Sequence, residues 1–406
     1  MAKLIRDPEL ERLVEELNSE EMDAPRSDAA PATRPEWPPA QVRSGNALEA
    51  MLIEMARRGA SDLHVIAGSP AVFRVGGRLM RSDSAPLSGD ETQSIFNELM
   101  SSRVRDAIES GGSADFSLRL ANAASEDDRR AWRFRVNIHR QRGTLAAAIR
   151  ALPSQIPTIN ELNLPLTLAD LVKPTRGLVL LCGPTGSGKT TTLAALLGEI
   201  NRSEARHIIT IEDPIEYEHR NQHAVIEQIE VGRDAPSFAA ALRAALRQDP
   251  DVILVGEMRD LETVSIALTA AETGHLILST LHTSDVASAI HRIVDVFPPL
   301  QQTQIKHQLA MSLNAIVCQH LIPRSNGEGR SVAVEVLLAT HPVRNHIRND
   351  KLANLVSEIT LGKRVGMISL EDSLVRLVRQ GLISVEDARI RSARPDELES
   401  LLRSSP

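Results

Sequence analysis

The sequence lacks any long apolar run. No stretch approaches the roughly 18 consecutive apolar residues that a membrane-spanning helix needs, and no signal-peptide pattern opens the chain. Cysteine is scarce as well, with only Cys182 and Cys318, both in apolar segments and in no C-x-x-C pair. We therefore expect a cytoplasmic chain without direct membrane insertion, with no zinc site and with both cysteines as small buried hydrophobes.

Positive charge is in deficit. Lys and Arg number 46 against 53 Asp and Glu, for a formal net charge of −7. This balance argues against a general nucleic-acid binder and predicts no nucleic-acid partner. The hydrophobic fraction of 42% and the charged fraction of 24% are ordinary for a globular protein, and 406 residues allow two or three domains.

The pattern along the chain predicts five regions. A helix over 7–17 and a Pro-rich, disordered linker over 22–45 come first, within a region that ends at residue 45. A small α+β domain is expected over 46–152, with helices at 47–57 and 88–110, strands at 62–66, 71–75, 78–80, 132–137 and 144–149, and an exposed loop at 121–130. A proline-marked linker over 153–172, an α/β domain over 173–342 and short helices over 343–406 follow.

The α/β domain alternates short apolar strands with helices, which indicates a parallel sheet with crossover connections. We expect strands at 177–182, 207–211, 251–255 and 275–280, and helices at 190–201, 237–248 and 261–272. Two later strands, at 316–322 and 332–338, are expected as an antiparallel addition.

A phosphate-binding loop is the most informative stretch. It follows the strand at 177–182, precedes a helix, and comprises Gly183, Pro184, Thr185, Gly186, Ser187, Gly188, Lys189, Thr190 and Thr191. Strand, Gly-rich turn and Lys-Thr at a helix start is the context in which a G-x-x-x-x-G-K-[ST] match binds a nucleoside triphosphate. Lys189 would reach the β- and γ-phosphates, and the Thr190 hydroxyl would hold Mg²⁺.

Polar groups follow three other predicted strands, where ligands bind in such sheets. Glu212 and Asp213 end one strand and are candidates for holding Mg²⁺ or orienting water; capping by Asp213 before Pro214 is the structural alternative. Glu257 follows another and is the candidate to polarise the attacking water, against the alternative of a surface salt bridge with Arg259.

The strand before Glu257 resembles a Walker B strand, but Gly256 stands where many NTPases carry a metal-binding aspartate. This shifts the expected metal role toward Thr190 and the Glu212–Asp213 pair. The last strand and the residues after it carry His275, Thr280 and His282. Thr280 and His282 are candidates to contact the γ-phosphate, and His275 is a further candidate to contact the nucleotide, with a structural role as its alternative.

Four motifs together resemble the type II/IV secretion ATPase superfamily. They are GPTGSGKTT, ITIEDPIEY, LRQDPDVILVGEMRD and TGHLILSTLHT, in family order and spacing. Matches at 60–64, 134–137 and 343–348 point to its type IV pilus retraction (twitching motility) branch, and the resemblance covers about 46–395. The absence of a four-cysteine zinc module supports that branch. His346, the extension over 1–45 and the insert at 121–130 depart from it.

The resemblance implies a RecA-like ATPase domain preceded by a PAS-like domain and followed by C-terminal helices. It also implies an ATP- and Mg²⁺-dependent homohexameric motor, peripheral at the inner membrane, with a pilus platform protein and a paralogous motor ATPase as partners. Small-domain arginines complete such sites from a neighbouring subunit, and Arg135, Arg140 and Arg142 are the candidates here.

Alternatives to pilus retraction stay open. A secretion or conjugation ATPase would drive a related machine, and a regulatory subunit would modulate a partner motor without significant turnover. A nucleic-acid translocase is disfavoured by the net charge.

Overall fold

The computed structural model describes residues 40–41, 47–120, 132–327 and 329–404. The predicted helix over 7–17 and the predicted loop at 121–130 lie outside these residues, as does all of the predicted linker except Ala40–Gln41. That dipeptide forms a short strand, contrary to the prediction of a linker. No helix within the described ranges combines the length and the apolar character needed to cross a bilayer.

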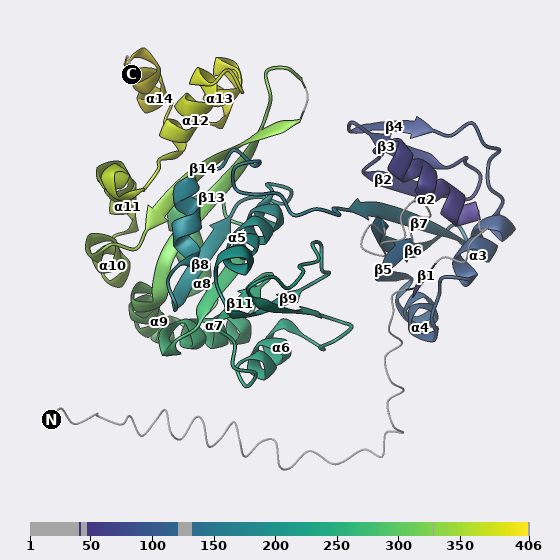
Figure 1. Cartoon of the computed structure of the whole chain (residues 1–406), viewed down its shortest axis with the longest axis horizontal. Coiled ribbons are helices and arrows are strands. Elements are labelled where there is room, and N and C mark those ends of the chain that lie inside the picture. Colours follow the sequence, from purple (N-terminus) through teal and green to yellow (C-terminus); the bar gives the residue numbers. More distant parts are fainter. Residues whose placement is uncertain (1–39, 42–46, 121–131, 328, 405–406) are drawn as a thin grey trace, which may run out of the picture. The chain divides into compact units, whose positions relative to one another are not determined.

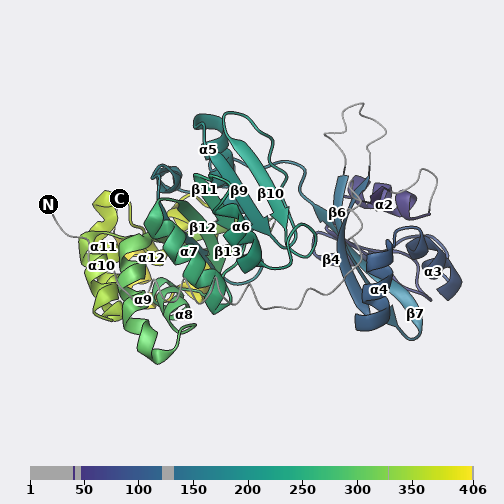
Figure 2. The ribbon, with the colours of Figure 1, turned by 90° about the horizontal axis from the view of Figure 1, so that it is seen from below.

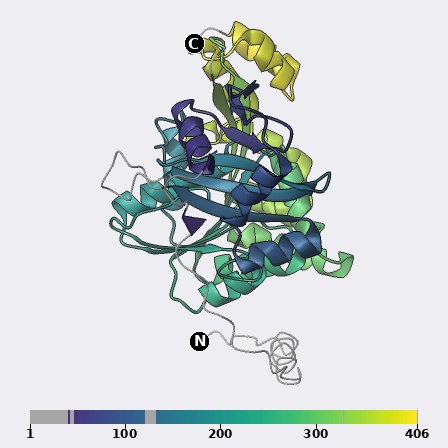
Figure 3. The same ribbon diagram turned by 90° about the vertical axis from the view of Figure 1, so that its right-hand side faces the viewer.

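The first of two sheets is built from residues 40–152. Its described strands, in spatial order, are β1 (Ala40–Gln41), β5 (Ser113–Leu120), β6 (Trp132–Gln141), β7 (Thr144–Leu152), β2 (Asp62–Val65), β3 (Val72–Val75) and β4 (Arg78–Arg81). All neighbours are antiparallel except β1, which lies parallel to β5. Helices α2 (Ala47–Arg57), α3 (Gly89–Asn97) and α4 (Ser102–Gly111) share one apolar core with the sheet and lie across it in Figure 3.

Local signals explain most of these boundaries. Gly76 and Gly77 both take positive φ, of 54° and 82°, as the two-residue β3–β4 hairpin requires. Ser88 begins α3 with a capping box closed by Glu91. The single helical stretch predicted for 88–110 is wrong, because Ser101 caps a second helix that starts anew at Ser102.

The second sheet follows the expected crossover pattern. Its described strands, in spatial order, are β10 (Val225–Glu230), β9 (His207–Glu212), β11 (Val252–Val255), β12 (Leu276–Leu281), β8 (Gly177–Cys182), β13 (Leu313–Pro323) and β14 (Arg330–Leu338). β13 pairs parallel with β8, and only β14 runs antiparallel. The prediction that both late strands are antiparallel is therefore wrong for β13, which two unpredicted helices, α8 (Val286–Val294) and α9 (Pro299–Ser312), connect to β12 as a crossover.

Both faces are covered at the centre of this sheet, which explains why the central strands β8 and β11 are apolar and fully buried. Leu178 and Leu180 of β8 join a core with α6 (Phe238–Ala245), α7 (Leu261–Thr273), α8, α9, α10 (His341–Arg348) and α11 (Leu355–Leu361). The alternating residues Val179 and Leu181 join a separate core with α5 (Lys189–Ser203) and the 3₁₀ helix η3 (Leu166–Val172). Figure 2 shows the strands lying between these helices.

The C-terminal helices pack on the strands that follow β12. Helices α12 (Leu370–Arg379), α13 (Val385–Arg391) and α14 (Pro395–Arg403) form a small core of their own with Ile322 of β13 and Ala333 of β14. They are the yellow elements beside β14 in Figure 1. The short helices predicted from residue 343 onward are confirmed.

Candidate nucleotide site

The phosphate loop joins β8 to α5. Gly183, Gly186 and Gly188 take φ values of 145°, 77° and 88°, which only glycine adopts without strain, and Gly188 caps α5 in the left-handed conformation. Lys189 is buried and its Nζ donates to the carbonyls of Gly183 at 2.8 Å and Pro184 at 3.1 Å. Burial lowers the pKa of this ammonium group. The ammonium group therefore lies inside the loop and is bound to loop carbonyls. Charged phosphate oxygens would be stronger hydrogen-bond acceptors for it than these carbonyls.

Three strand ends meet beside this loop. The Gly256 amide donates to the Ile211 carbonyl at 2.8 Å, and the Thr280 hydroxyl donates to the Gly256 carbonyl at 2.6 Å. A Cβ on Gly256 would approach the Ile211 oxygen to 3.1 Å, so the residue in the place of a Walker B aspartate leaves little room for a side chain. The ends of β9, β11 and β12 are thus fixed to one another.

Glu257 and His282 lie together at this edge. Glu257 Oε2 is 3.7 Å from His282 Nε2 and 2.7 Å from an Arg259 guanidinium nitrogen. The salt bridge between Glu257 and Arg259, which the sequence offered as the alternative to a catalytic role, is present. The same carboxylate also faces His282. Burial, together with the charges of Lys189 and Arg259, lowers the pKa of His282, which keeps its ring neutral near pH 7.

His282 also faces the phosphate loop. Its Nδ1 is 3.5 Å from the Thr185 hydroxyl, and the charge of Lys189 acts on its titration. A neutral imidazole in this position can donate through one nitrogen and accept through the other. The structure therefore brings Glu257, His282 and the loop residues Thr185 and Lys189 into one polar group.

Glu212 closes the β9 side of the site. Its carboxylate accepts from the Thr210 hydroxyl at 2.7 Å and from Gln228 Nε2 at 3.2 Å. Burial raises the pKa of Glu212, and these two hydrogen bonds oppose the shift. Asp213 is exposed just beyond the strand end.

His275 is not brought to the phosphate loop. It precedes Leu276, which pairs with Gly177 at the start of β8, so it lies at the sheet edge opposite Gly183. Its Nδ1 is 3.1 Å from the Ala270 carbonyl at the end of α7. Strand pairing places the two histidines at opposite ends of β12, so His275 does not join His282 beside the phosphate loop, and its contact with a nucleotide stays a prediction.

The candidate arginines belong to the first sheet. Arg135 of β6 lies on the face away from the apolar core and pairs with Asp115 of β5 at 3.3 Å. Arg140 and Arg142 are exposed near the β6–β7 turn, where Arg142 takes a φ of 48°. A role for any of them in a neighbouring subunit stays a prediction.

Sequence reasoning missed three residues that hold the site. Tyr217, the only tyrosine of the chain, is buried with its hydroxyl 3.0 Å from the Thr191 hydroxyl. Gln228 Nε2 donates to the Tyr217 carbonyl at 2.9 Å, and Gln319 of β13 contacts the phosphate loop from behind. Tyr217 lies within the motif ITIEDPIEY, so the sequence could have indicated it. Gln228 and Gln319 belong to no motif, and their spacing does not indicate a role at the site.

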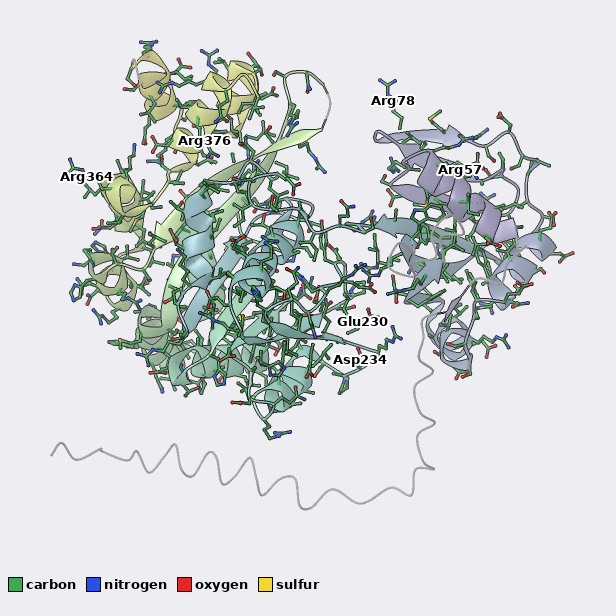
Figure 4. The ribbon with its side chains drawn as sticks, in the orientation of Figure 1. Arg57, Arg78, Glu230, Asp234, Arg364 and Arg376 are labelled. Atoms are coloured by element: carbon green, nitrogen blue, oxygen red, sulfur yellow. The ribbon has the colours of Figure 1, made fainter. Side chains whose placement is uncertain are left out.

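The acidic turn after β9 has further support. Glu230, at the end of β10, accepts from the Ile215 amide at 3.2 Å, while its own amide donates to Asp234 at 2.8 Å. Figure 4 shows Glu230 and Asp234 near each other. Arg133 of β6 donates to the Ile215 carbonyl at 2.8 Å and the Glu216 carbonyl at 3.0 Å. The turn that carries Tyr217 is therefore held on several sides.

The loop fits a bound phosphate chain. The Ser187 hydroxyl is buried and has no hydrogen-bond partner within the described structure, although it lies in the loop itself. A Cβ on Gly183 would meet the Gln319 carbonyl at 2.5 Å, so the backbone turn there leaves no room for a side chain. An unpaired hydroxyl, a buried ammonium and glycine turns are groups that phosphate oxygens satisfy.

The family described as Type II/IV secretion system protein matches residues 44–350. This chain belongs to that family. It is 43% identical to the type IV pilus retraction ATPase PilT of Pseudomonas aeruginosa over 328 residues, which cover 81% of this chain and 93% of the relative. It is 42% identical to a twitching motility protein of Neisseria gonorrhoeae, covering 78% of this chain and 82% of that protein.

The fold agrees with this membership. The crystal structure of the pilus retraction motor PilT with bound ADP matches with a TM-score of 0.79 and 44% identity, over 87% of this chain and 99% of that one. The predicted α/β fold, with an N-terminal α+β domain and C-terminal helices, is confirmed. The chain is a nucleotide-binding ATPase of the pilus retraction type.

Proposed function

We propose that this chain is an ATP-hydrolysing homohexameric motor that powers type IV pilus retraction. The observation that carries the proposal is the placement of Glu257 and His282 beside a complete phosphate loop. The loop supplies a lysine and a threonine for the phosphates, and the neighbouring strand end supplies a carboxylate that can accept a proton from water.

Each site residue has a proposed role. Lys189 and the amides of the loop bind the phosphates, with Thr190 and Asp213 as the groups that would hold Mg²⁺ beside them. The ion, when bound, neutralises developing phosphate charge. Glu257 orients the attacking water and accepts its proton, and His282 faces that carboxylate at 3.7 Å. Glu212 is a further candidate to orient the water.

The site is proposed to be completed across a subunit boundary. Arg135, Arg140 and Arg142 of one chain are candidates to reach the site of its neighbour, because a guanidinium stabilises charge spread over the transferred phosphoryl oxygens. The proposal includes a small domain over 46–152 and an ATPase domain over 173–342. Hydrolysis would change the angle between these two domains.

The partners are also proposals. A motor of this kind would act peripherally at the cytoplasmic face of the inner membrane, on a pilus platform protein. A paralogous motor ATPase is a further candidate partner.

The proposal is tested in a twitching bacterium that encodes this chain. Deletion of the gene for this chain, complemented by wild type or by Lys189→Ala, is followed by imaging of labelled pili, with the mass and the ATP turnover of the purified protein measured in parallel. We expect a hexamer, and retraction restored by wild type alone. Retraction that persists after deletion would assign the motor to another machine, and a monomer without turnover would favour a regulatory subunit.

A further inference from the structure

Gln319 lies directly behind the phosphate loop. β13 runs parallel to β8, and Cys318 pairs with Cys182 in the last register position. Gln319 therefore follows at the level where β8 ends and the loop begins at Gly183. Its side chain is buried, with 1% of the residue exposed.

Both ends of the Gln319 amide are used. Nε2 donates to the Ser187 carbonyl at 2.7 Å, and Oε1 accepts from the Thr192 hydroxyl at 2.9 Å. Because a carbonyl can only accept, the contact with Ser187 fixes which end of the amide is the nitrogen. One side chain thereby joins the loop to the first turn of α5.

The bond to Ser187 sets the direction of the next amide. In a trans peptide the C=O and the following N–H point in opposite directions. A Ser187 carbonyl held toward β13 therefore turns the Gly188 N–H away from β13, into the loop. Inward N–H groups at a helix start are the groups that bind phosphate oxygens.

Two motif glycines are matched to Gln319. A Cβ on Gly183 would lie 2.5 Å from the backbone carbonyl oxygen of residue 319, and a Cβ on Gly188 would lie 2.9 Å from Nε2 of the Gln319 side chain. Contacts this short do not occur without movement, and both glycines have positive φ. The loop therefore packs against the backbone of β13 at Gly183 and against the Gln319 side chain at Gly188.

We propose that Gln319 is a positioning residue that holds the phosphate loop in its nucleotide-binding conformation. It acts through the Ser187–Gly188 peptide and touches no reacting atom. This inference rests on the proposed nucleotide site, and on a strand that lies more than 100 residues after the motif.

The test compares the full-length wild type with Gln319→Met, which keeps the volume and removes both hydrogen bonds. Gln302→Met is the matched control, because Gln302 also donates to a backbone carbonyl, that of Phe297 at 3.1 Å, but does so on α9. Calorimetric titration with ADP should show a dissociation constant raised about tenfold or more in Gln319→Met and unchanged in the control. The KM for ATP should rise by a similar factor, with a smaller change in kcat.

Hydrogen exchange of the nucleotide-free proteins gives a second readout. Amides of the loop at 183–190 should exchange faster in Gln319→Met, with β8 and β12 unchanged. If that variant does not fold, the neutral substitution Gln319→Asn supplies both readouts, because it keeps an amide but is one methylene too short to bond to Ser187 and Thr192 together.

The outcomes distinguish an error in the proposed nucleotide site from an error in the proposed role of Gln319. Wild type that binds no ADP would overturn the proposed nucleotide site itself. Wild type that binds ADP, with a folded variant that binds it equally and exchanges its loop amides at the same rate, would overturn the role of Gln319 alone.

Discussion

Glu335 lies on β14 opposite Cys318 of β13, with most of its side chain buried. Its carboxyl group accepts a hydrogen bond from the Val286 amide at the start of α8, and the charges of Glu371 and Asp285 act on it. Burial is the largest effect and raises the pKa of Glu335 to about 7, from an ordinary value of 4.5. This carboxyl group is therefore protonated in the folded chain over a pH range where it is ionised in the unfolded chain.

The sign of the effect on stability follows from proton binding. Between pH 4.5 and about 7 the folded state holds a proton on Glu335 that the unfolded state has lost, so stability falls as pH rises through this window. At about 1.4 kcal/mol for each pKa unit, the loss approaches about 3 kcal/mol above pH 7. Glutamine cannot ionise and can still accept from Val286, so Glu335→Gln removes this loss.

We expect urea unfolding of wild type and Glu335→Gln to give similar stabilities at pH 4, below the ordinary pKa of the carboxyl group. At pH 8.5 the variant should be more stable, by up to about 3 kcal/mol. Burial lowers the pKa of His320 to about 4, so this residue lowers the free energy of unfolding as pH falls from 6.5. Because both proteins contain His320, its effect cancels in the difference between them. Glu109→Gln, on the exposed surface of α4, is the control. A difference that stays constant with pH, or that favours wild type at pH 8.5, would refute the reasoning.

Three further substitutions test the contacts around the site and the C-terminal helices. Arg394→Met leaves the fully buried carboxylate of Glu371 without its 2.6 Å ion pair, and should lower the free energy of unfolding by about 3–5 kcal/mol; an unchanged melting temperature would show that the pair is not needed. Tyr217→Phe removes the hydrogen bond to Thr191 and should cost about 1 kcal/mol of stability. Thr191→Val should cost a similar amount and the double variant no more than either, whereas additive losses would show that the two hydroxyls act separately.

The apolar pattern and the glycine motif predicted the centre of the ATPase sheet well. The strand at 177–182 has the predicted bounds, because a fully buried parallel strand reads as a continuous apolar run. The meeting of Glu257 with His282 also followed from the sequence. Parallel strands bring their carboxyl ends to one edge, so polar residues after two strands were expected to lie near each other.

Other features depend on pairing that a single sequence does not express. β5 was missed although its polar and apolar residues alternate, which is the pattern of a half-buried strand, and β10 was missed because the adjacent polar residues Glu227 and Gln228 break that alternation. The direction of β13 depends on the α8–α9 crossover, which the pattern did not reveal. Gln319 and Gln228 carry no motif, and only strand register shows that they reach the loop and the acidic turn.

ATP turnover by purified wild type and Glu257→Gln tests the central claim most directly. Glu262→Gln on α7, an exposed carboxylate of the same kind, serves as the control. We expect turnover by wild type and the control, with a loss of at least about a hundredfold in Glu257→Gln while ATP affinity is kept. Turnover by Glu257→Gln at the wild-type rate would contradict the account, because the carboxylate beside the phosphate loop would then not activate the water.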